Sequence, residues 1–499
     1  MRGTLLLPVF LLLSAAASAQ SPQPSASPEP VRAHRAISTN VADAQAAFDD
    51  GLTLLYAFNP EEARRSFERA TRADPSLAIA WWGVAMSHGP NINTAYDERA
   101  QKRGHDAIVK AQTLEAGAMP AERALIEAAA ARFKFDGPGD GDRAARAYRT
   151  AMKAAAAEYA TDDDLQTLTA EAQMDVHPWG FFTRDGAALD DTDDIIARLT
   201  AVLARSPHHL GANHLMIHAL EESPTPERAL PSADYLASIA LEPAAEHLIH
   251  MPAHAYMRAG RYHSAGMANL HAIEAYRRYL ETDPPGHADY FGHDCVFGVD
   301  AFLMSDEAAR AHELATLCAR GGATMAGVID VRFRRWDALG KDDNLGSFSL
   351  GMLAAHERRT TAANTQLAAM RTGTDAVSKI EQALLTAAIA RSEGRSTDEI
   401  AALEHAVAAQ SQGWYSEPPR FFYPARESLG GALFRAERFE DAERVFRADL
   451  TENRDNPRSL FGLAQTLARE NRPDDAAAIQ KRFDAASPQA DVPYDMSDL

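Results

Sequence analysis

Apolar residues, many of them alanine, recur at spacings of three and four along nearly the whole chain. Residues at these spacings share one face of an α-helix, so the pattern predicts a succession of amphipathic helices. No stretch of alternating Val, Ile and Thr rivals this helical pattern. We therefore expect an all-α fold with strand content close to zero.

Small and aromatic residues mark an internal repeat at both ends of the chain. Gly51, Ala63 and Phe67 fall where a tetratricopeptide unit of about 34 residues places its small contact residues and its aromatic residue, and Gly430 and Phe446 repeat the pattern. Two helices of a hairpin pack closely only where side chains are small, and each hairpin buries its other face on the next. Residues 39–499 are thus predicted to form a single tetratricopeptide-like helix-hairpin solenoid, with a histidine-rich central section at about 170–300.

The first residues have the pattern of a secretory signal peptide. Arg2 is followed by the apolar stretch from Leu5 to Leu13 and by the small residues Ala17-Ser18-Ala19. Residues 1–19 are therefore predicted to be a signal peptide, and the Pro- and Ser-rich residues 20–38 a flexible leader. No later stretch is long and uncharged enough to span a membrane. We expect export to the periplasm or the medium, without a membrane partner.

Charge and cysteine content narrow the classes of partner. Acidic residues exceed basic residues by 20, and the basic residues are scattered along the chain. Nucleic acid and anionic membrane surfaces are therefore not expected as partners. Cys295 and Cys318 form a disulfide only if the fold brings them together, which their spacing does not decide.

The histidines supply the candidate chemistry. Eight of the 18 lie between His208 and His263. In one predicted helix His214, His218 and Glu221 stand at i, i+4 and i+7, so two imidazoles and a carboxylate share a face. Imidazole and carboxylate groups in this arrangement are ligands for zinc, copper or iron. The alternative is a buried helix whose histidines are satisfied by hydrogen bonds.

A second cluster follows one repeat later. It consists of His247, His250 and His254, with Pro252 suited to the first turn of a helix. Helices one repeat apart are usually neighbours in a solenoid, so we expect the two clusters to converge. His177 and His293 lie in irregular aromatic segments, and either is able to close a pocket walled by Trp179 and Tyr290; the alternative is a packing role.

These observations lead to one main hypothesis and one rival. The main hypothesis is a secreted metal-dependent enzyme, a hydrolase or oxidoreductase, with a pocket for a small molecule or peptide on the concave face. Its predicted metal ligands are His214, His218, His250, His254, His247 and His293. Glu221 and His177 are the predicted catalytic residues, with Glu222 and Glu171 as further candidate proton carriers. The rival is a non-enzymatic scaffold that binds peptides or exported proteins.

Several short motifs resemble those of a family of exported bacterial tetratricopeptide-repeat proteins. They include Asn59-Pro60-Glu61-Glu62-Ala63, Met174-Asp175-Val176-His177-Pro178-Trp179, Gly211-Ala212-Asn213-His214, His250-Met251-Pro252 and Glu417-Pro418-Pro419. The resemblance spans most of the chain and implies the same repeat fold and histidine positions, but no established reaction. In the family pattern a second histidine stands where this chain has Val296, after His293. The resemblance thus leaves open whether Cys295 replaces that group.

Overall fold

The computed structural model describes residues 29–134, 141–282, 290–318, 324–342, 345–370, 373–412 and 415–499. Within these ranges the chain is helical, and the only strand-like pairings are two isolated bridges, Asn91 with Thr94 and Phe182 with Ala188. The predicted all-α fold is confirmed. The predicted signal peptide lies outside the described residues.

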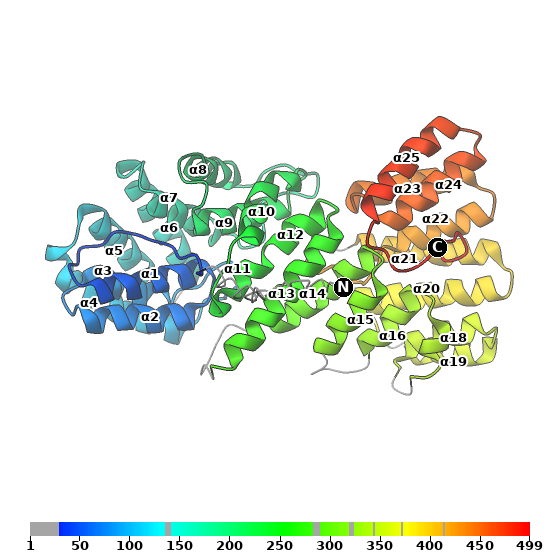
Figure 1. Cartoon of the computed structure of the whole chain (residues 1–499), viewed down its shortest axis with the longest axis horizontal. Helices are drawn as coiled ribbons and strands as arrows, with labels where there is room; N and C mark the ends of the chain where they lie inside the picture. Colours follow the sequence, from blue (N-terminus) through cyan, green and yellow to red (C-terminus); the bar gives the residue numbers. More distant parts are fainter. Residues whose placement is uncertain are drawn as a thin grey trace, which may run out of the picture.

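The first helices form the end of the molecule drawn in blue and cyan in Figure 1. They are α1 (Ala42–Tyr56), α2 (Pro60–Ala73), α3 (Ala78–Met86), α4 (Glu98–Leu114), α5 (Pro120–Arg132), α6 (Gly141–Glu158), α7 (Asp163–Met174) and α8 (Thr192–Arg205), with a short 3-10 turn η1 (Glu115–Gly117). Consecutive helices pair as antiparallel hairpins, and α1, α3 and α5 also contact one another in sequence.

The middle section, drawn in green, carries the histidine-rich segment. Its elements are α9 (Leu210–Glu221), η2 (Pro226–Ala229), α10 (Leu230–Ser238), η3 (Pro243–Ala245), α11 (Glu246–His250), α12 (Pro252–Arg258), α13 (Tyr262–Leu280), α14 (Phe291–Met304) and α15 (Ala308–Leu317). The short helices α11 and α12 meet at Pro252, which stands at the first position of α12 as predicted.

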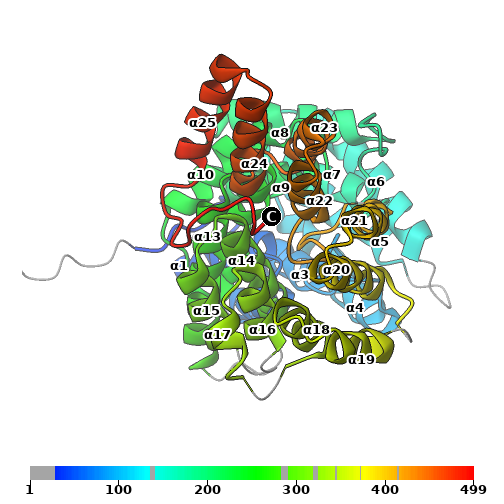
Figure 2. The ribbon, with the colours of Figure 1, turned by 90° about the vertical axis from the view of Figure 1, so that its right-hand side faces the viewer.

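The last section continues the array to the C-terminus. It contains α16 (Thr324–Arg332), α17 (Trp336–Leu339), α18 (Ser347–His356), α19 (Thr360–Met370), α20 (Ala376–Ser392), α21 (Ser396–Ser411), α22 (Ala425–Arg435), α23 (Phe439–Glu452), α24 (Pro457–Arg469) and α25 (Pro473–Ala486). Viewed along the long axis, the hairpins are arranged around a common centre (Figure 2). The fold is a tetratricopeptide-like helix-hairpin solenoid. No helix among the described residues is long and apolar enough to cross a membrane.

Helix α2 illustrates how the sequence builds a repeat. The side chain of Asn59 caps the helix by accepting a hydrogen bond from the backbone N–H of Glu62. Pro60 occupies the first turn, where the helix needs no backbone donor. Its buried face presents Ala63 and Phe67 to the neighbouring helices. Phe67 is fully buried, and its ring is in the place where a Cβ on Gly51 or Gly83 would lie. Glycine in α1 and α3 therefore makes room for the aromatic ring between them.

The first repeat also reaches the middle of the chain. Residues 29–38, the described part of the predicted leader, lie against the folded chain: Val31 N–H donates to Ala240 O over 2.8 Å, and Arg35 pairs with Asp162 at 2.7 Å. Helix α1 contacts α9 directly. The start of the solenoid thus packs against the helix that carries His214 and His218.

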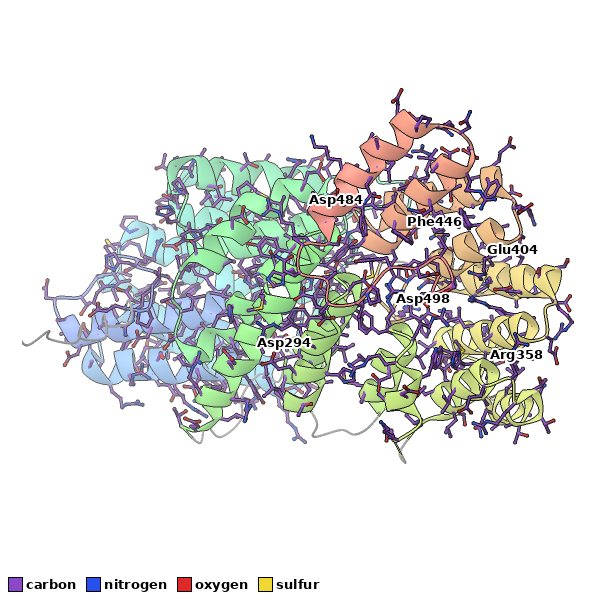
Figure 3. The ribbon with its side chains drawn as sticks, turned by 45° about the vertical axis from the view of Figure 1, so that its right-hand side comes forward. Asp294, Arg358, Glu404, Phe446, Asp484 and Asp498 are labelled. Atoms are coloured by element: carbon purple, nitrogen blue, oxygen red, sulfur yellow. A yellow bond between two sulfur atoms is a disulfide. The ribbon has the colours of Figure 1, made fainter. Side chains whose placement is uncertain are left out.

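The same close packing predicts that adding one methyl group to a glycine in the C-terminal repeats lowers the stability of the fold. Phe446, labelled in Figure 3, fills the space beside Gly462, where an added Cβ would lie 2.3 Å from the ring. Gly462→Ala is expected to lower the free energy of unfolding by about 1–2 kcal/mol, because overpacking outweighs the higher helix propensity of alanine. Chemical unfolding followed by circular dichroism measures this. The matched control is Gly117→Ala, whose Cβ meets nothing within 4 Å; equal stability of the two variants would contradict the packing argument.

Candidate metal centre

Six histidines from four helices gather in the middle of the molecule. Helix α9 supplies two, α11 two, and α12 and α14 one each: His214, His218, His247, His250, His254 and His293. Five are buried, and His293 is half-buried. They form two sets of three in which the candidate ligand atoms lie within 4.8 Å of one another. The structure therefore brings together every histidine predicted as a metal ligand, but as two adjacent clusters.

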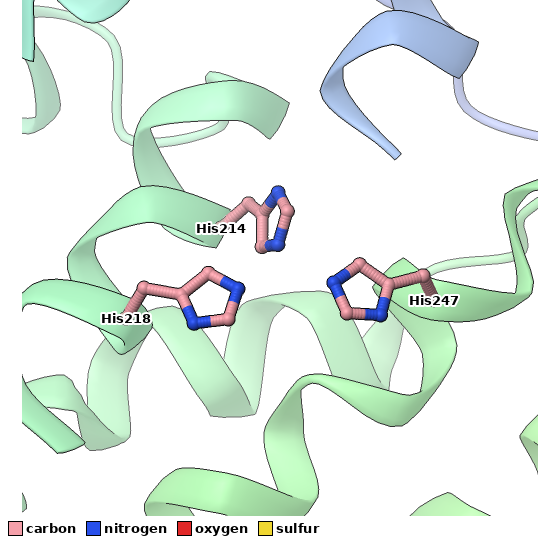
Figure 4. A group of neighbouring side chains, drawn as sticks. All are labelled: His214, His218 and His247. Carbon is pink, nitrogen blue, oxygen red and sulfur yellow. The ribbon is translucent and has the colours of Figure 1, made fainter. Parts of the chain in front are cut away.

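The first cluster consists of His214, His218 and His247, and their rings face a common point (Figure 4). The ring centroid of His214 lies 4.8 Å from that of His218 and 5.0 Å from that of His247. Phe58, in the turn between α1 and α2, packs against all three rings, with its centroid 4.5 Å from that of His214. An aromatic side chain of the first repeat thus closes one side of the cluster.

Hydrogen bonds fix the orientation of two of these rings. His214 Nδ1 lies 2.7 Å from the carbonyl oxygen of Tyr56, which can only accept, so Nδ1 carries the proton. His218 Nδ1 lies 3.0 Å from Glu221 Oε1 and donates in the same way. In each neutral ring Nε2 then carries no proton and presents a lone pair. Both Nε2 atoms, and both ring nitrogens of His247, are buried without a hydrogen-bond partner among the described residues.

The surroundings favour the neutral form of these imidazoles. Burial and the neighbouring histidines hold the pKa of His214 and of His247 well below its usual range. Burial also lowers the pKa of His218, although the charge of Glu221 opposes it. A neutral imidazole is the form that binds a metal ion. The cluster is therefore in a ligating state at neutral pH.

The second cluster consists of His250, His254 and His293. His250 Nε2 lies 2.8 Å from His254 Nε2 and 3.2 Å from His293 Nε2. Phe297 packs against the three rings at centroid distances of 5.0 to 5.7 Å. The clusters adjoin each other, since the rings of His247 and His250 are 5.9 Å apart and those of His218 and His254 are 6.0 Å apart.

Glu221 joins the two clusters. One carboxylate oxygen accepts from His218 Nδ1, and the other lies 2.8 Å from His254 Nδ1. Burial disfavours its charge, but the imidazoles of His254 and His218 lower its pKa to about 2. Burial likewise opposes protonation of His254, yet Glu221 and Glu417 raise its pKa to about 10. Both oxygens of Glu221 thus lie against Nδ1 atoms, and Glu221, His254 and Glu417 form a third group whose candidate ligand atoms lie within 4.8 Å of one another.

A pocket of about 390 Å³ opens beside both clusters. His218 and His247 of the first cluster and His254 and His293 of the second line it. Its other walls include the predicted Trp179 and Tyr290, together with Tyr415. Trp179 is held there by its indole N–H, which donates to Ile92 O over 2.8 Å. A pocket of this size, with aromatic walls and a few polar groups, suits a small molecule.

Two carboxylates, Glu222 and Glu417, line the pocket. Glu417 is bonded to His254, whereas burial of Glu222 together with the charge of Glu221 raises the pKa of Glu222 to about 7. A group with such a pKa is able to both accept and donate a proton near neutral pH. Glu222, a candidate proton carrier from the sequence, therefore lies in the pocket with a suitable pKa.

Two predicted residues lie elsewhere. His177 does not line the pocket: its side chain is 51% exposed, and its Nε2 pairs with Asp190 at 3.2 Å. The chain turns at Trp179, which has a positive φ of 60°, so the indole and not the imidazole reaches the pocket. Glu171 is buried in α7 next to Asp175 and Arg132, also away from the pocket.

Sequence reasoning missed several contributors. Glu417 Oε2 lies 2.6 Å from His254 Nδ1, although the two residues are 163 positions apart in the sequence. Asn269 and Asp294 contact His250, and Phe58 packs on the first cluster. The motif residue Glu417 was visible as part of the resemblance, whereas Phe58 and Asn269 gave no signal.

The region after His293 also departs from the family pattern in a defined way. Val296 is 41% exposed, whereas the neighbouring Cys295 and Phe297 are buried. Cys295 forms a disulfide with Cys318, which follows α15. Cys295 therefore does not supply a thiol in place of the missing histidine, and His293 joins the second cluster without either residue.

Comparisons with known proteins add little to this description. No protein-family model matches the chain, and no curated protein sequence matches it. Among solved structures, the Cut9–Hcn1 heterotetramer of the APC/C matches at 14% identity over 89% of this chain and 74% of that chain, with a TM-score of 0.30. Ypp1 matches at 9% identity over 94% and 68% (TM-score 0.33), and yeast Tom70 at 10% over 89% and 92% (TM-score 0.27). At such scores the fold assignment rests on the chain's own helix hairpins.

Proposed function

We propose that this chain is an exported metal-dependent enzyme whose first cluster, His214, His218 and His247, holds one divalent transition-metal ion. The observation that supports this most strongly is the set of buried imidazole nitrogens without partners. Leaving such nitrogens unpaired costs free energy, about 1–3 kcal/mol each. Their convergence on one point is accounted for if an ion is their partner.

The ligand set agrees with a catalytic site more than with a structural one. Three protein ligands leave a fourth position open on a four-coordinate ion, which is the usual arrangement in catalytic zinc sites. Two of the three ligands, His218 and His247, also line the pocket. The Nδ1 bonds of His214 to Tyr56 O and of His218 to Glu221 are the kind of outer contact that orients metal-bound imidazoles.

Imidazole ligands accept zinc, copper and iron, so hydrolysis and oxidation both remain within this proposal. A bound ion would supply Lewis acidity or redox chemistry at the pocket. The protein itself would contribute Glu222 as a proton acceptor and donor, and Trp179 and Tyr290 as apolar walls that position a small substrate. Glu221 would keep His218 correctly oriented.

Export is part of the same proposal. The pattern of residues 1–19 supports it, and so does the disulfide between Cys295 and Cys318, because disulfides persist in oxidising compartments. The second candidate function is a scaffold that binds peptides or exported proteins. The repeat fold supports it, since solenoid surfaces commonly bind proteins. In that case the histidines would be buried packing groups.

Metal content tests the first cluster. His247→Ala is the most informative change, because neither nitrogen of His247 has a hydrogen-bond partner in the described part of the chain, so the substitution breaks no hydrogen bond there. We expect this variant to bind zinc, copper or iron at least about 100-fold more weakly than the wild type, since it loses one of three ligands. Competition with a chelator of known affinity measures the change.

The control is His405→Ala, which removes an exposed imidazole from α21. It should bind metal as the wild type does. If the wild type binds none of the three ions, or if His247→Ala and His405→Ala bind equally well while both stay helical, the metal-dependent reading is wrong. The scaffold function would then be the better account.

The raised pKa of Glu222 predicts a pH-dependent stability difference. The folded chain keeps the proton up to about pH 7, whereas the unfolded chain loses it near 4.5, so ionisation destabilises the fold as pH rises between these values. Glu222→Gln removes this loss. Relative to the wild type, the metal-free variant should therefore gain about 2–3 kcal/mol in free energy of unfolding between pH 4.5 and pH 8.

Denaturant unfolding at the two pH values measures this gain. The matched control is Glu404→Gln on the exposed face of α21, which should show no such change. A gain of the same size in both variants, or in neither, would mean that Glu222 ionises in the folded chain as it does in water.

A further inference from the structure

In the second cluster, hydrogen bonds within the protein do not account for the close approach of three imidazole nitrogens. His250 Nδ1 lies 2.7 Å from Asn269 Oδ1. The orientation of that amide is set by its nitrogen, which donates to Ala265 O over 2.9 Å. The oxygen therefore faces His250, and His250 Nδ1 must be the donor. The Nε2 atom of the neutral His250 ring then carries a lone pair.

The rings of His254 and His293 also direct their Nε2 atoms toward Nε2 of His250. His254 Nδ1 lies between two carboxylate oxygens, Glu221 Oε2 at 2.8 Å and Glu417 Oε2 at 2.6 Å, so it also donates. Its Nε2 points at His250 Nε2 from 2.8 Å, and His293 Nε2 approaches the same atom at 3.2 Å. The lone pair of His250 Nε2 accepts one well-formed hydrogen bond, yet two imidazole nitrogens lie within hydrogen-bonding distance of it. A shared proton satisfies one pair, whereas a cation satisfies all three nitrogens.

The spacing agrees with a cation. Nitrogens bound to one tetrahedral zinc ion at about 2.0–2.1 Å lie about 3.3 Å apart. The contacts of His250 Nε2, at 2.8 and 3.2 Å, need to lengthen by only a few tenths of an ångström to reach this spacing. The three candidate ligand atoms all lie within 4.8 Å of one another.

The charged groups around the second cluster also favour a bound cation. Glu221, Glu417 and Asp294 are all buried around this cluster, and Asp294 Oδ1 lies 3.2 Å from His250 Nδ1. Buried carboxylates are costly unless positive charge compensates them. His254, which lies between Glu221 and Glu417, supplies one such charge when it is protonated, and a cation bound to the three imidazoles would take its place.

We propose that His250, His254 and His293 bind a second transition-metal ion, so that the chain holds a two-metal centre with three imidazoles at each ion. This inference rests on the proposed function of the first cluster. His218 and His247 line the pocket from one side and His254 and His293 from the other. A small ligand with oxygen donors, bound in the pocket, would contact both ions. Paired ions of this kind clamp the oxygens of a reacting group.

The experiment is a metal count on the full mature chain, freed of metal, loaded separately with zinc and with copper(II), and passed over a desalting column. His293→Ala reports on the second cluster, because His293 is only half-buried and its Nε2 contacts His250 Nε2. His247→Ala reports on the first, and His405→Ala is the control. We expect two equivalents in the wild type and in the control, and one in each of the other variants.

The outcomes separate the two proposals. One equivalent in the wild type that is lost in His247→Ala and kept in His293→Ala overturns the second site and leaves the first. One equivalent that shows the reverse pattern overturns the two-metal centre and the proposed function of the first cluster together, and so does a wild type without metal. Circular dichroism shows whether the variants are folded. If His293→Ala is not, His293→Gln replaces it, and a wild-type count below two overturns the proposal in any case.

Discussion

The hydrogen bond from His214 Nδ1 to the carbonyl oxygen of Tyr56 joins the first repeat of the solenoid to its middle. It forms at the end of α1, the helix that packs against α9, and two residues later Phe58 covers the three rings of the first cluster. The bond sets which nitrogen of His214 is protonated and therefore which one faces the other ligands. The site thus depends on the curvature of the whole N-terminal array, because only that curvature brings α1 and α9 together.

Buried carboxylates provide the second constraint. Glu221 holds His218 with one oxygen and His254 with the other, and Glu417 reaches His254 from the far C-terminal part of the chain. Each carboxylate selects a protonated Nδ1 and leaves Nε2 to face inward. The same groups supply the negative charge that a cation requires in an interior of low polarity. Orientation and charge compensation therefore come from the same side chains.

The local features of this fold could be predicted from the sequence, and the long-range ones could not. The pairing of Gly51 with Phe67 and of Gly430 with Phe446 follows from a repeat pattern, which is a local property. The spacing of His214 and His218 on one helix face is also local. The division of six histidines into two clusters depends on where α11 and α14 sit in space, and the contribution of Glu417 depends on a contact across 163 positions. The sequence also could not show that the turn at Trp179 places the indole in the pocket while His177 pairs with Asp190.

The central claim is that His214, His218 and His247 bind one ion, and a crystal structure of the metal-loaded chain, with diffraction recorded at the absorption edge of the metal, tests it most directly. The account predicts an anomalous peak about 2.0–2.1 Å from Nε2 of His214, from Nε2 of His218 and from one ring nitrogen of His247. A peak at surface histidines only, or a loaded crystal in which the three rings keep their nitrogens without an ion between them, would contradict it.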